Sequence, residues 1–269
     1  MQKLVKSLPL ESGCWICLKR RLAVSSLPDS LKQAYLEGTL TEAVAEIADE
    51  ALAFDASQYL LEPFSIESEG HCDTLIVFAH GAGANMHHEF MTTIANGLGL
   101  GNAANLRIVR FNFPYMRANA IDGKRRPPDR APKLIADYAL QLSIFKRQFM
   151  PRKIYLVGKS MGGRMSAILA ESLAVDGVVC LGYPFIPLKG GEPRLEPIEK
   201  CSAPILVIQG ERDKFGHKGL VETWPVMDKV QLHWLTDGDH SFKPRKSSGT
   251  TLDANLAQAI SVIQAFIKH

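Results

Sequence analysis

The sequence predicts an α/β fold, in which a mostly parallel β-sheet is covered by helices on both faces. From Thr74 onwards, short apolar runs recur along the chain, and helical patterns lie between most of them. Strands that are apolar throughout are typical of sheets buried on both faces, and such sheets are usually parallel. We expect strands at Leu75–Ala79, Leu106–Phe111, Ile154–Val157, Val178–Leu181, Ile205–Ile208 and Val230–Leu235.

Two longer segments predict helices that cover this sheet. Residues 134–149 and 252–267 place a large apolar side chain at every third or fourth position, which gives each helix one face to bury. A shorter helix-compatible run occupies residues 164–170. Phe64–Ile66 is a candidate edge strand.

Residues 1–62 do not share this alternation and predict a separate helical extension. Thr39 with Glu42 three residues later forms a candidate capping box, and apolar residues from position 44 to 54 fall on one helix face. We expect a helical extension of unknown role over 1–62 and the α/β domain over 63–269.

Composition favours a cytoplasmic protein. The chain has 269 residues, of which 46% are apolar, and its net charge of +3 is too small to indicate nucleic-acid binding. The five cysteines form no regular framework, which fits reduced thiols. No apolar run resembles a leader or reaches membrane-spanning length, so we expect no membrane partner. The sequence sets no oligomeric state.

Cys14 and Cys17 have the spacing of half a zinc site. A structural zinc ion needs four ligands. The nearby candidates, His71 and Cys72, are adjacent in sequence and would fit one tetrahedral site badly. Two ordinary buried cysteines are therefore favoured, and no metal is expected.

A serine between two glycines follows one of the predicted strands. Residues 158–162 read Gly-Lys-Ser-Met-Gly, directly after the apolar run that ends at Val157. A serine on such a strand-to-helix turn projects its hydroxyl out of the sheet, and the helix N-terminus directs free N–H groups at the same place. We predict Ser160 as a nucleophile. A glycine-rich turn of this kind can instead bind a phosphate. The residues that follow the other strands must therefore distinguish a nucleophile from a phosphate-binding turn.

The strand that ends at Ala79 is followed by another glycine-rich turn, at 80–83. A His-Gly-x-Gly turn can supply a backbone N–H to an oxyanion, together with the N–H after the nucleophile. We assign these donors as Ala82 and Met161, and expect His80 to shape the turn rather than to act as a base. The alternative is an ordinary strand–helix glycine turn.

An acid and a histidine follow two successive later strands. In a parallel sheet the carboxyl ends of the strands meet at one edge, so these residues are expected beside Ser160. We predict a triad of Ser160, Asp213 and His240, whose chain order is that of α/β-hydrolase triads. The rival acids are Glu211, Asp237 and Asp239. Asp239 is adjacent to His240 in the sequence, so its side chain would reach the imidazole with difficulty.

Together these motifs resemble the α/β-hydrolase superfamily, from roughly residue 64 to the end of the chain. More narrowly, they resemble the dienelactone-hydrolase-like group that includes a testis-expressed protein and subunit 3 of the nuclear non-specific-lethal acetyltransferase complex. This resemblance implies a three-layer α/β/α sandwich. The matching stretches are His80–Gly83, Phe113–Met116, Arg126–Asp129, Gly158–Arg164, Gly182–Phe185 and Gln209–Asp213.

The triad and the resemblance predict a serine hydrolase, of the carboxylesterase or dienelactone-hydrolase type, acting on a small ester or lactone. Acyl transfer through an acyl-enzyme requires no metal or organic cofactor. Two alternatives stay open. One is an interaction module with little or no turnover, because the nuclear member of the resembling group acts as a complex subunit. The other is a thioesterase or peptidase on the same triad, because the pocket sets the substrate.

Two connections between strands bear on substrate choice. Residues 182–203 are too few for a full cap domain, which predicts an open cleft. Residues 114–132 carry Arg117 and Arg126, which could present a basic rim to an acidic acyl group. The alternative, which we favour, is a solvated loop whose arginines pair with local acids.

Overall fold

A computed structural model of the protein describes residues 72–99 and 106–268. None of the helices within these ranges is long and apolar enough to cross a membrane. Several predicted features lie outside the described residues, namely the extension over 1–62, the candidate edge strand Phe64–Ile66, and Cys14, Cys17 and His71 of the candidate zinc site.

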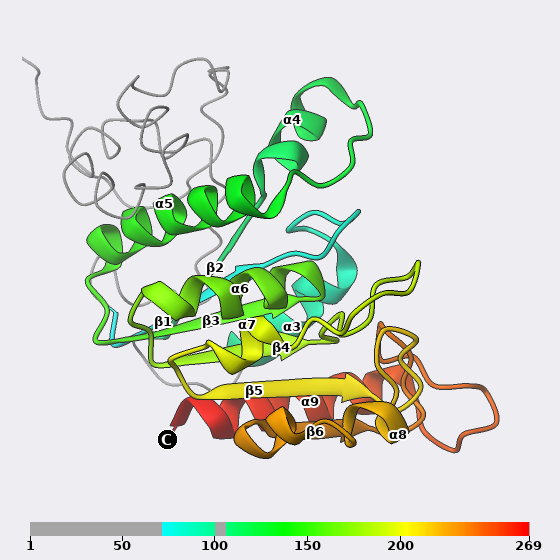
Figure 1. The fold of residues 1–269 in the computed structure, drawn as a ribbon. Coiled ribbons are helices and arrows are strands. Elements are labelled where there is room, and N and C mark those ends of the chain that lie inside the picture. Colours follow the sequence, from blue (N-terminus) through cyan, green and yellow to red (C-terminus); the bar gives the residue numbers. More distant parts are fainter. Residues whose placement is uncertain (1–71, 100–105, 269) are drawn as a thin grey trace, which may run out of the picture.

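A six-stranded sheet runs through the centre of the domain, in the order β2-β1-β3-β4-β5-β6 (Figure 1). Every neighbouring pair of strands is parallel, as the apolar runs predict. The strands are β1 (Thr74–Ala79), β2 (Leu106–Phe111), β3 (Lys153–Lys159), β4 (Gly177–Leu181), β5 (Ile205–Gly210) and β6 (Gln231–Leu235). Each of them overlaps one of the predicted runs.

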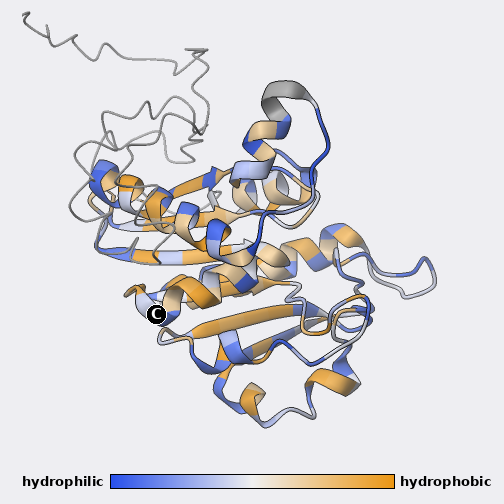
Figure 2. Cartoon of the chain, turned by 45° about the horizontal axis from the view of Figure 1, so that its top comes forward, coloured by the Kyte–Doolittle hydropathy of each residue, from blue (hydrophilic) through white to orange (hydrophobic). Residues whose placement is uncertain are grey.

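Helices cover both faces of the sheet, which confirms the three-layer sandwich. The long helices α5 (Ala131–Phe149) and α6 (Met161–Ser172) pack on one face, in one apolar cluster with the sheet. The helices α3 (Glu89–Gly99) and α9 (Leu252–Lys268) pack on the other face, in a second cluster. Figure 2 shows that the strands between these layers are mainly hydrophobic, whereas the helices also carry hydrophilic residues.

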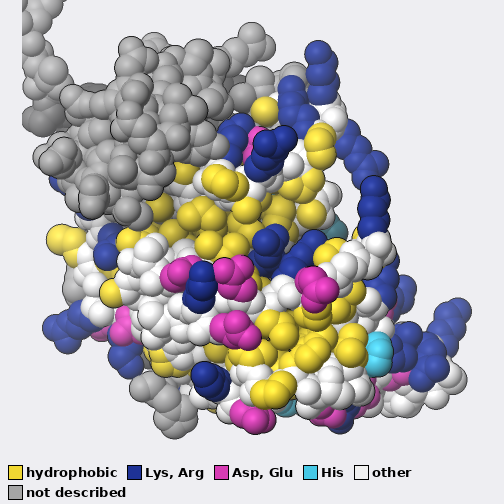
Figure 3. Space-filling model, in the orientation of Figure 1, with side chains coloured by type: hydrophobic (Ala, Val, Ile, Leu, Met, Phe, Trp, Pro, Cys, Tyr) yellow, Lys and Arg dark blue, Asp and Glu magenta, His cyan; other side chains and the backbone are white. Residues whose placement is uncertain are grey.

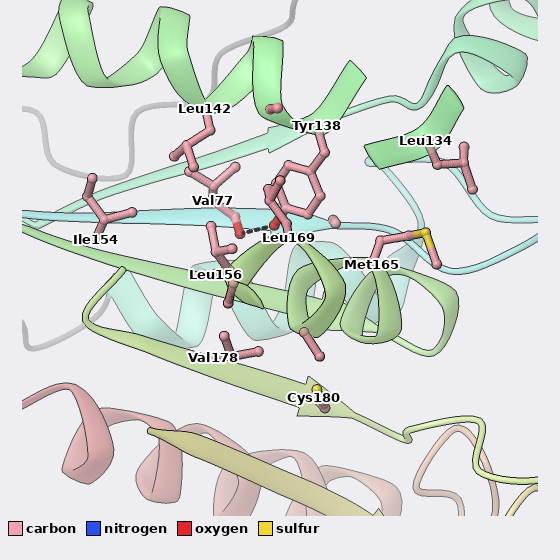
Figure 4. Packing of buried hydrophobic residues seen from close by; sticks show 14 of the residues in the cluster. Val77, Leu134, Tyr138, Leu142, Ile154, Leu156, Met165, Leu169, Val178 and Cys180 are labelled. Atoms are coloured by element: carbon pink, nitrogen blue, oxygen red, sulfur yellow. Dashed lines mark hydrogen bonds between the residues drawn. The ribbon is translucent and has the colours of Figure 1, made fainter. Parts of the chain in front are cut away.

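Side chains of β1 alternate between the two apolar clusters, as the pleat of a strand requires. Leu75 and Val77 belong to the cluster with α5 and α6, whereas Ile76 and Phe78 belong to the cluster with α3 and α9. On the first face, Tyr138 of α5 points at the sheet, and its hydroxyl donates a hydrogen bond of 3.2 Å to the Val77 carbonyl (Figure 4). The buried phenol is thereby satisfied, and the helix is fixed on the sheet.

The connection after β2 is more ordered than the sequence predicts. Its first part forms the helix α4 (Pro114–Asp122), which was not expected because the segment has no apolar stripe. Proline at the first helical position and Gly123, with a φ of 71°, supply the start and stop signals. Later connections contain the short helices α7 (Glu196–Glu199) and α8 (Lys218–Val221) and the 3₁₀ turn η3 (Pro225–Lys229).

The register of the central strands determines which loops meet. Ala79 at the end of β1 pairs with Gly158 near the end of β3. The glycine-rich turn after β1 and the serine turn after β3 therefore leave the sheet side by side, at its carboxyl edge.

Candidate active site

Ser160 sits on a strained turn between β3 and α6. Its backbone has a φ of 51° and a ψ of −113°, a region that residues with a side chain rarely adopt. The flanking glycines allow the turn to be this tight. A Cβ at Gly158 would lie 2.2 Å from the Gly162 carbonyl carbon, and a Cβ at Gly162 would lie 2.3 Å from the Ala79 carbonyl oxygen. Only glycine fits at either position.

The structure brings Ser160, His240 and Asp213 into one hydrogen-bonded chain. The Ser160 hydroxyl donates to Nε2 of His240 at 2.9 Å. Nδ1 of the same ring donates to Oδ2 of Asp213 at 2.7 Å. This assignment follows from the chemistry, because a carboxylate can only accept, so Nδ1 carries the proton and Nε2 is free to accept one. The three residues come from the loops after β3, β5 and β6.

Asp213 is fully buried and held by two further donors. The Gln209 side-chain amide donates to Oδ2 at 2.9 Å, and the Phe215 N–H donates to Oδ1 at 2.9 Å. Gln209 is itself fixed, because its amide oxygen accepts from the Tyr183 N–H at 2.8 Å. Gln209 lies in one of the stretches that carry the family resemblance, but the sequence alone assigns it no role in the site. The sequence feature that could have indicated such a role is a polar residue near the end of the otherwise apolar strand β5.

Burial lowers the pKa of His240 below its ordinary value, although the hydrogen bond to Asp213 opposes the shift. The Phe215 ring lies against the imidazole, with 4.4 Å between ring centroids. The imidazole is thus largely neutral near pH 7, which is the form that can accept a proton.

The three rival acids are engaged elsewhere. Asp237 pairs with Arg245 at 2.6 Å and with Arg212 at 2.8 Å. Glu211 accepts a hydrogen bond from the Asp237 N–H at 2.9 Å. Asp239 accepts from two N–H groups of its own loop, at 2.8 and 3.0 Å, which folds the turn that carries the histidine. These contacts explain why none of the three rival carboxylates lies beside the imidazole.

His80 orients the turn after β1. Its Nε2 accepts from the Phe113 N–H at 3.0 Å, so its Nδ1 carries the proton and donates to the Gly81 carbonyl at 2.8 Å. Burial lowers the pKa of His80 to about 4, which keeps the ring neutral in this role. In a trans peptide the carbonyl and the next N–H point in opposite directions, so the Ala82 N–H is turned away from the His80 ring.

The same turn packs against the serine turn. A Cβ at Gly81 would lie 3.5 Å from the Ser160 Cβ. Met161 begins α6, so its N–H has no partner within the helix. Within the described residues, neither the Met161 N–H nor the Ala82 N–H donates to another group. Two backbone N–H groups therefore lack an acceptor among the described residues, one on each of these two adjacent turns.

A family model described as an alpha/beta hydrolase domain matches residues 72–268. The chain belongs to this family. Solved structures share the fold of the hydrolase domain at low sequence identity. An alpha-beta serine hydrolase homologue from Coxiella burnetii is 17% identical, with a TM-score of 0.53, and the match covers 74% of this chain and 86% of that one.

Two further structures have the same fold. Est1E from Butyrivibrio proteoclasticus is 12% identical, with a TM-score of 0.56 and coverage of 78% and 93%. A dienelactone hydrolase from Anabaena variabilis is 14% identical, with a TM-score of 0.54 and coverage of 78% and 97%. No curated protein matches the sequence significantly. The narrower resemblance to the nuclear complex subunit is not among these matches and stays a prediction.

The two arginines predicted to form a rim make local contacts in the hydrolase domain. Arg117 forms a bidentate ion pair with Asp137 of α5 and donates to the Asn112 carbonyl at 2.7 Å. Arg126 donates to the Lys124 carbonyl at 3.1 Å. Lys and Arg side chains follow one another along the outer edge of this connection (Figure 3). Arg117 is thus paired with an acid, as the alternative expects, but the acid belongs to α5 and not to the connection, and a role of either arginine in substrate binding stays a prediction.

Proposed function

We propose that the hydrolase domain is a serine hydrolase that cleaves a small carboxylic ester or lactone. The observation that carries the proposal is the hydrogen-bonded chain from Asp213 through His240 to Ser160. The serine lies on a turn with strained backbone, and such strain is concentrated at functional sites.

Each group in this chain has a role in acyl transfer. The Ser160 oxygen attacks the carbonyl carbon while His240 Nε2 takes its proton, and Asp213 stabilises the imidazolium that forms. The N–H groups of Ala82 and Met161 bind the oxyanion of the tetrahedral intermediate. The imidazolium then protonates the leaving oxygen, which leaves an acyl-serine. A water molecule, deprotonated by the same imidazole, attacks this ester and releases the acid.

The substrate class is inferred from the surroundings of the turn. The connection over 182–203 contains only the four-residue helix α7, which supports an open site without a cap. Solved structures with this fold include an esterase domain of a Rhodothermus marinus protein and the dienelactone hydrolase from Anabaena variabilis. An ester or lactone is therefore preferred over a thioester or a peptide, and a panel of the three substrate types tests that preference.

Labelling with a fluorophosphonate probe tests the reaction class. The probe phosphonylates a serine only where a neighbouring base activates it. We expect the full-length protein to be labelled, Ser160→Ala not to be labelled, and His240→Ala to be labelled at least about 10²-fold more slowly.

Ser166→Ala is the matched control, because this serine lies on α6, directly after the Ser160 turn, and its buried hydroxyl bonds to Tyr138 and to the Gly162 carbonyl rather than to a histidine. It should be labelled like the wild type. A folded wild-type protein that the probe does not label would refute the proposal and favour an interaction module with this fold.

A further inference from the structure

The side chain of Lys159 is buried behind the candidate histidine. Lys159 is the last residue of β3 and directly precedes Ser160, and it is 9% exposed. Its ammonium nitrogen donates a hydrogen bond of 2.6 Å to the backbone carbonyl of His240. This bond joins the serine turn to the loop after β6, across 81 residues of sequence.

The space around this ammonium group fits a cation. It faces the rings of Phe90 from α3 and Phe242, at 5.3 and 5.8 Å from their centroids, where the ring faces attract positive charge. A Cβ at Gly182 would lie 2.7 Å from Nζ and 3.4 Å from the His240 Nδ1, so both groups crowd the same glycine. An amine and the imidazole are thus close neighbours.

Three titratable groups act on the ammonium. Asp213 follows β5, and Asp239 and His240 belong to the loop after β6. Burial lowers the pKa of Lys159 to about 8, and the charges of the two carboxylates oppose this shift. Near pH 7 the side chain is therefore mostly protonated. Within the described residues, no carboxylate lies at ion-pair distance from it.

A buried ammonium with one hydrogen bond is costly for folding. Methionine has nearly the same length and would fill an aromatic pocket without that cost. The sequence nevertheless has a lysine next to the nucleophile. A role in the chemistry of the site accounts for a buried lysine at this position better than packing does.

We propose that Lys159 is a positioning residue for His240, holding the histidine loop on the serine turn and keeping a positive charge behind the imidazole. The inference rests on the proposed function. Repulsion between the two cations disfavours protonation of the imidazole from solvent, so Nε2 stays ready to accept the serine proton, and Asp213 opposes this repulsion when the imidazolium forms in the reaction. The hydrogen bond to the backbone limits movement of the ring relative to the hydroxyl.

The test is the pH profile of fluorophosphonate labelling in Lys159→Met. Without the positive charge, imidazole is protonated more easily, so the acid midpoint of the labelling rate should move to higher pH by about 0.5–1 unit. Without the tether, the rate on the plateau should fall about tenfold or more. Thermal melting of each variant checks that it is folded.

Lys214→Met is the matched control. This lysine is exposed and lies 5.5 Å from the centre of the Phe215 ring, which in turn contacts His240. Solvent screens its charge, so its removal should leave the midpoint within about 0.2 unit of the wild type.

The outcomes separate this inference from the proposed function. If the wild type is not labelled, or if Ser160→Ala still is, the proposed function fails. If the wild type is labelled at Ser160 but Lys159→Met keeps the wild-type midpoint, the role of Lys159 is overturned, whatever happens to the plateau. A shift in Lys159→Met that Lys214→Met does not reproduce supports the proposal.

Discussion

Nδ1 of His240 donates a hydrogen bond of 2.7 Å to the fully buried Asp213, although 27 residues separate the two in the sequence. The carboxylate cannot turn away, because Gln209 and the Phe215 N–H hold both of its oxygens. One orientation of the imidazole is therefore built into the folded domain.

Asp213→Asn should reduce labelling of Ser160 by about 10³–10⁴-fold, because an amide can donate to Nδ1 and so favour the wrong tautomer. The second-order labelling rate measures this. Asp239→Asn is the comparison, since that carboxylate accepts from N–H groups of its own loop. A similar loss in both variants would contradict the assignment of the acid.

The acid limb of the wild-type labelling rate should have its midpoint below pH 6.5, the ordinary pKa of histidine. The reason is that burial lowers the pKa of His240, and the rate falls only when the ring becomes protonated. Rates measured from pH 4 to 9 would locate the midpoint. A midpoint above 6.5 would mean that the contact with Asp213 outweighs burial.

Gly162→Ala should unfold or strongly destabilise the domain, by about 3 kcal/mol or more, because the new Cβ would collide with the Ala79 carbonyl at 2.3 Å. Chemical denaturation measures the loss. Gly219→Ala is the control, since a Cβ there has no neighbour nearer than 3.8 Å. Equal stability of the two variants would show that the turn can relax.

Lys159→Met should be at least as stable as the wild type at pH 7, because it removes the cost of a buried charge. The folded pKa is about 8 and the ordinary value is 10.5. Between these values the unfolded chain binds more protons, so the wild type gains stability as pH rises through this window. The difference in melting temperature should therefore shrink between pH 8 and 10.5, and a constant difference would argue against a charged lysine.

Asp237→Asn should weaken the fold without abolishing labelling, because this carboxylate pairs with Arg245 and Arg212 rather than with the histidine. The hydrogen bond from Arg245 lowers the pKa of Asp237 from 3.8 to about 2. Its contribution is complete above pH 3.8 and is lost as pH falls towards 2. Melting curves of both proteins should thus converge in strong acid.

The sheet was predictable because strands that are buried on both faces are apolar throughout. Runs such as Leu75–Ala79 show this pattern within a few consecutive residues, so it can be recognised from the local sequence. The helix α4 was not predictable in this way. It has no apolar stripe, and its start and stop signals at Pro114 and Gly123 resemble those of an ordinary turn.

The sequence by itself determined the layered α/β fold and the small group of residues that could share an edge of the sheet, since chain order and strand ends are local information. Only the tertiary structure decided which acid lies beside His240 and that Lys159 reaches behind it. Four carboxylates follow the last two strands, and the choice among them depends on neighbours such as Arg245 and Gln209 that folding brings from elsewhere. Distances between loops are a property of packing, which no local pattern encodes.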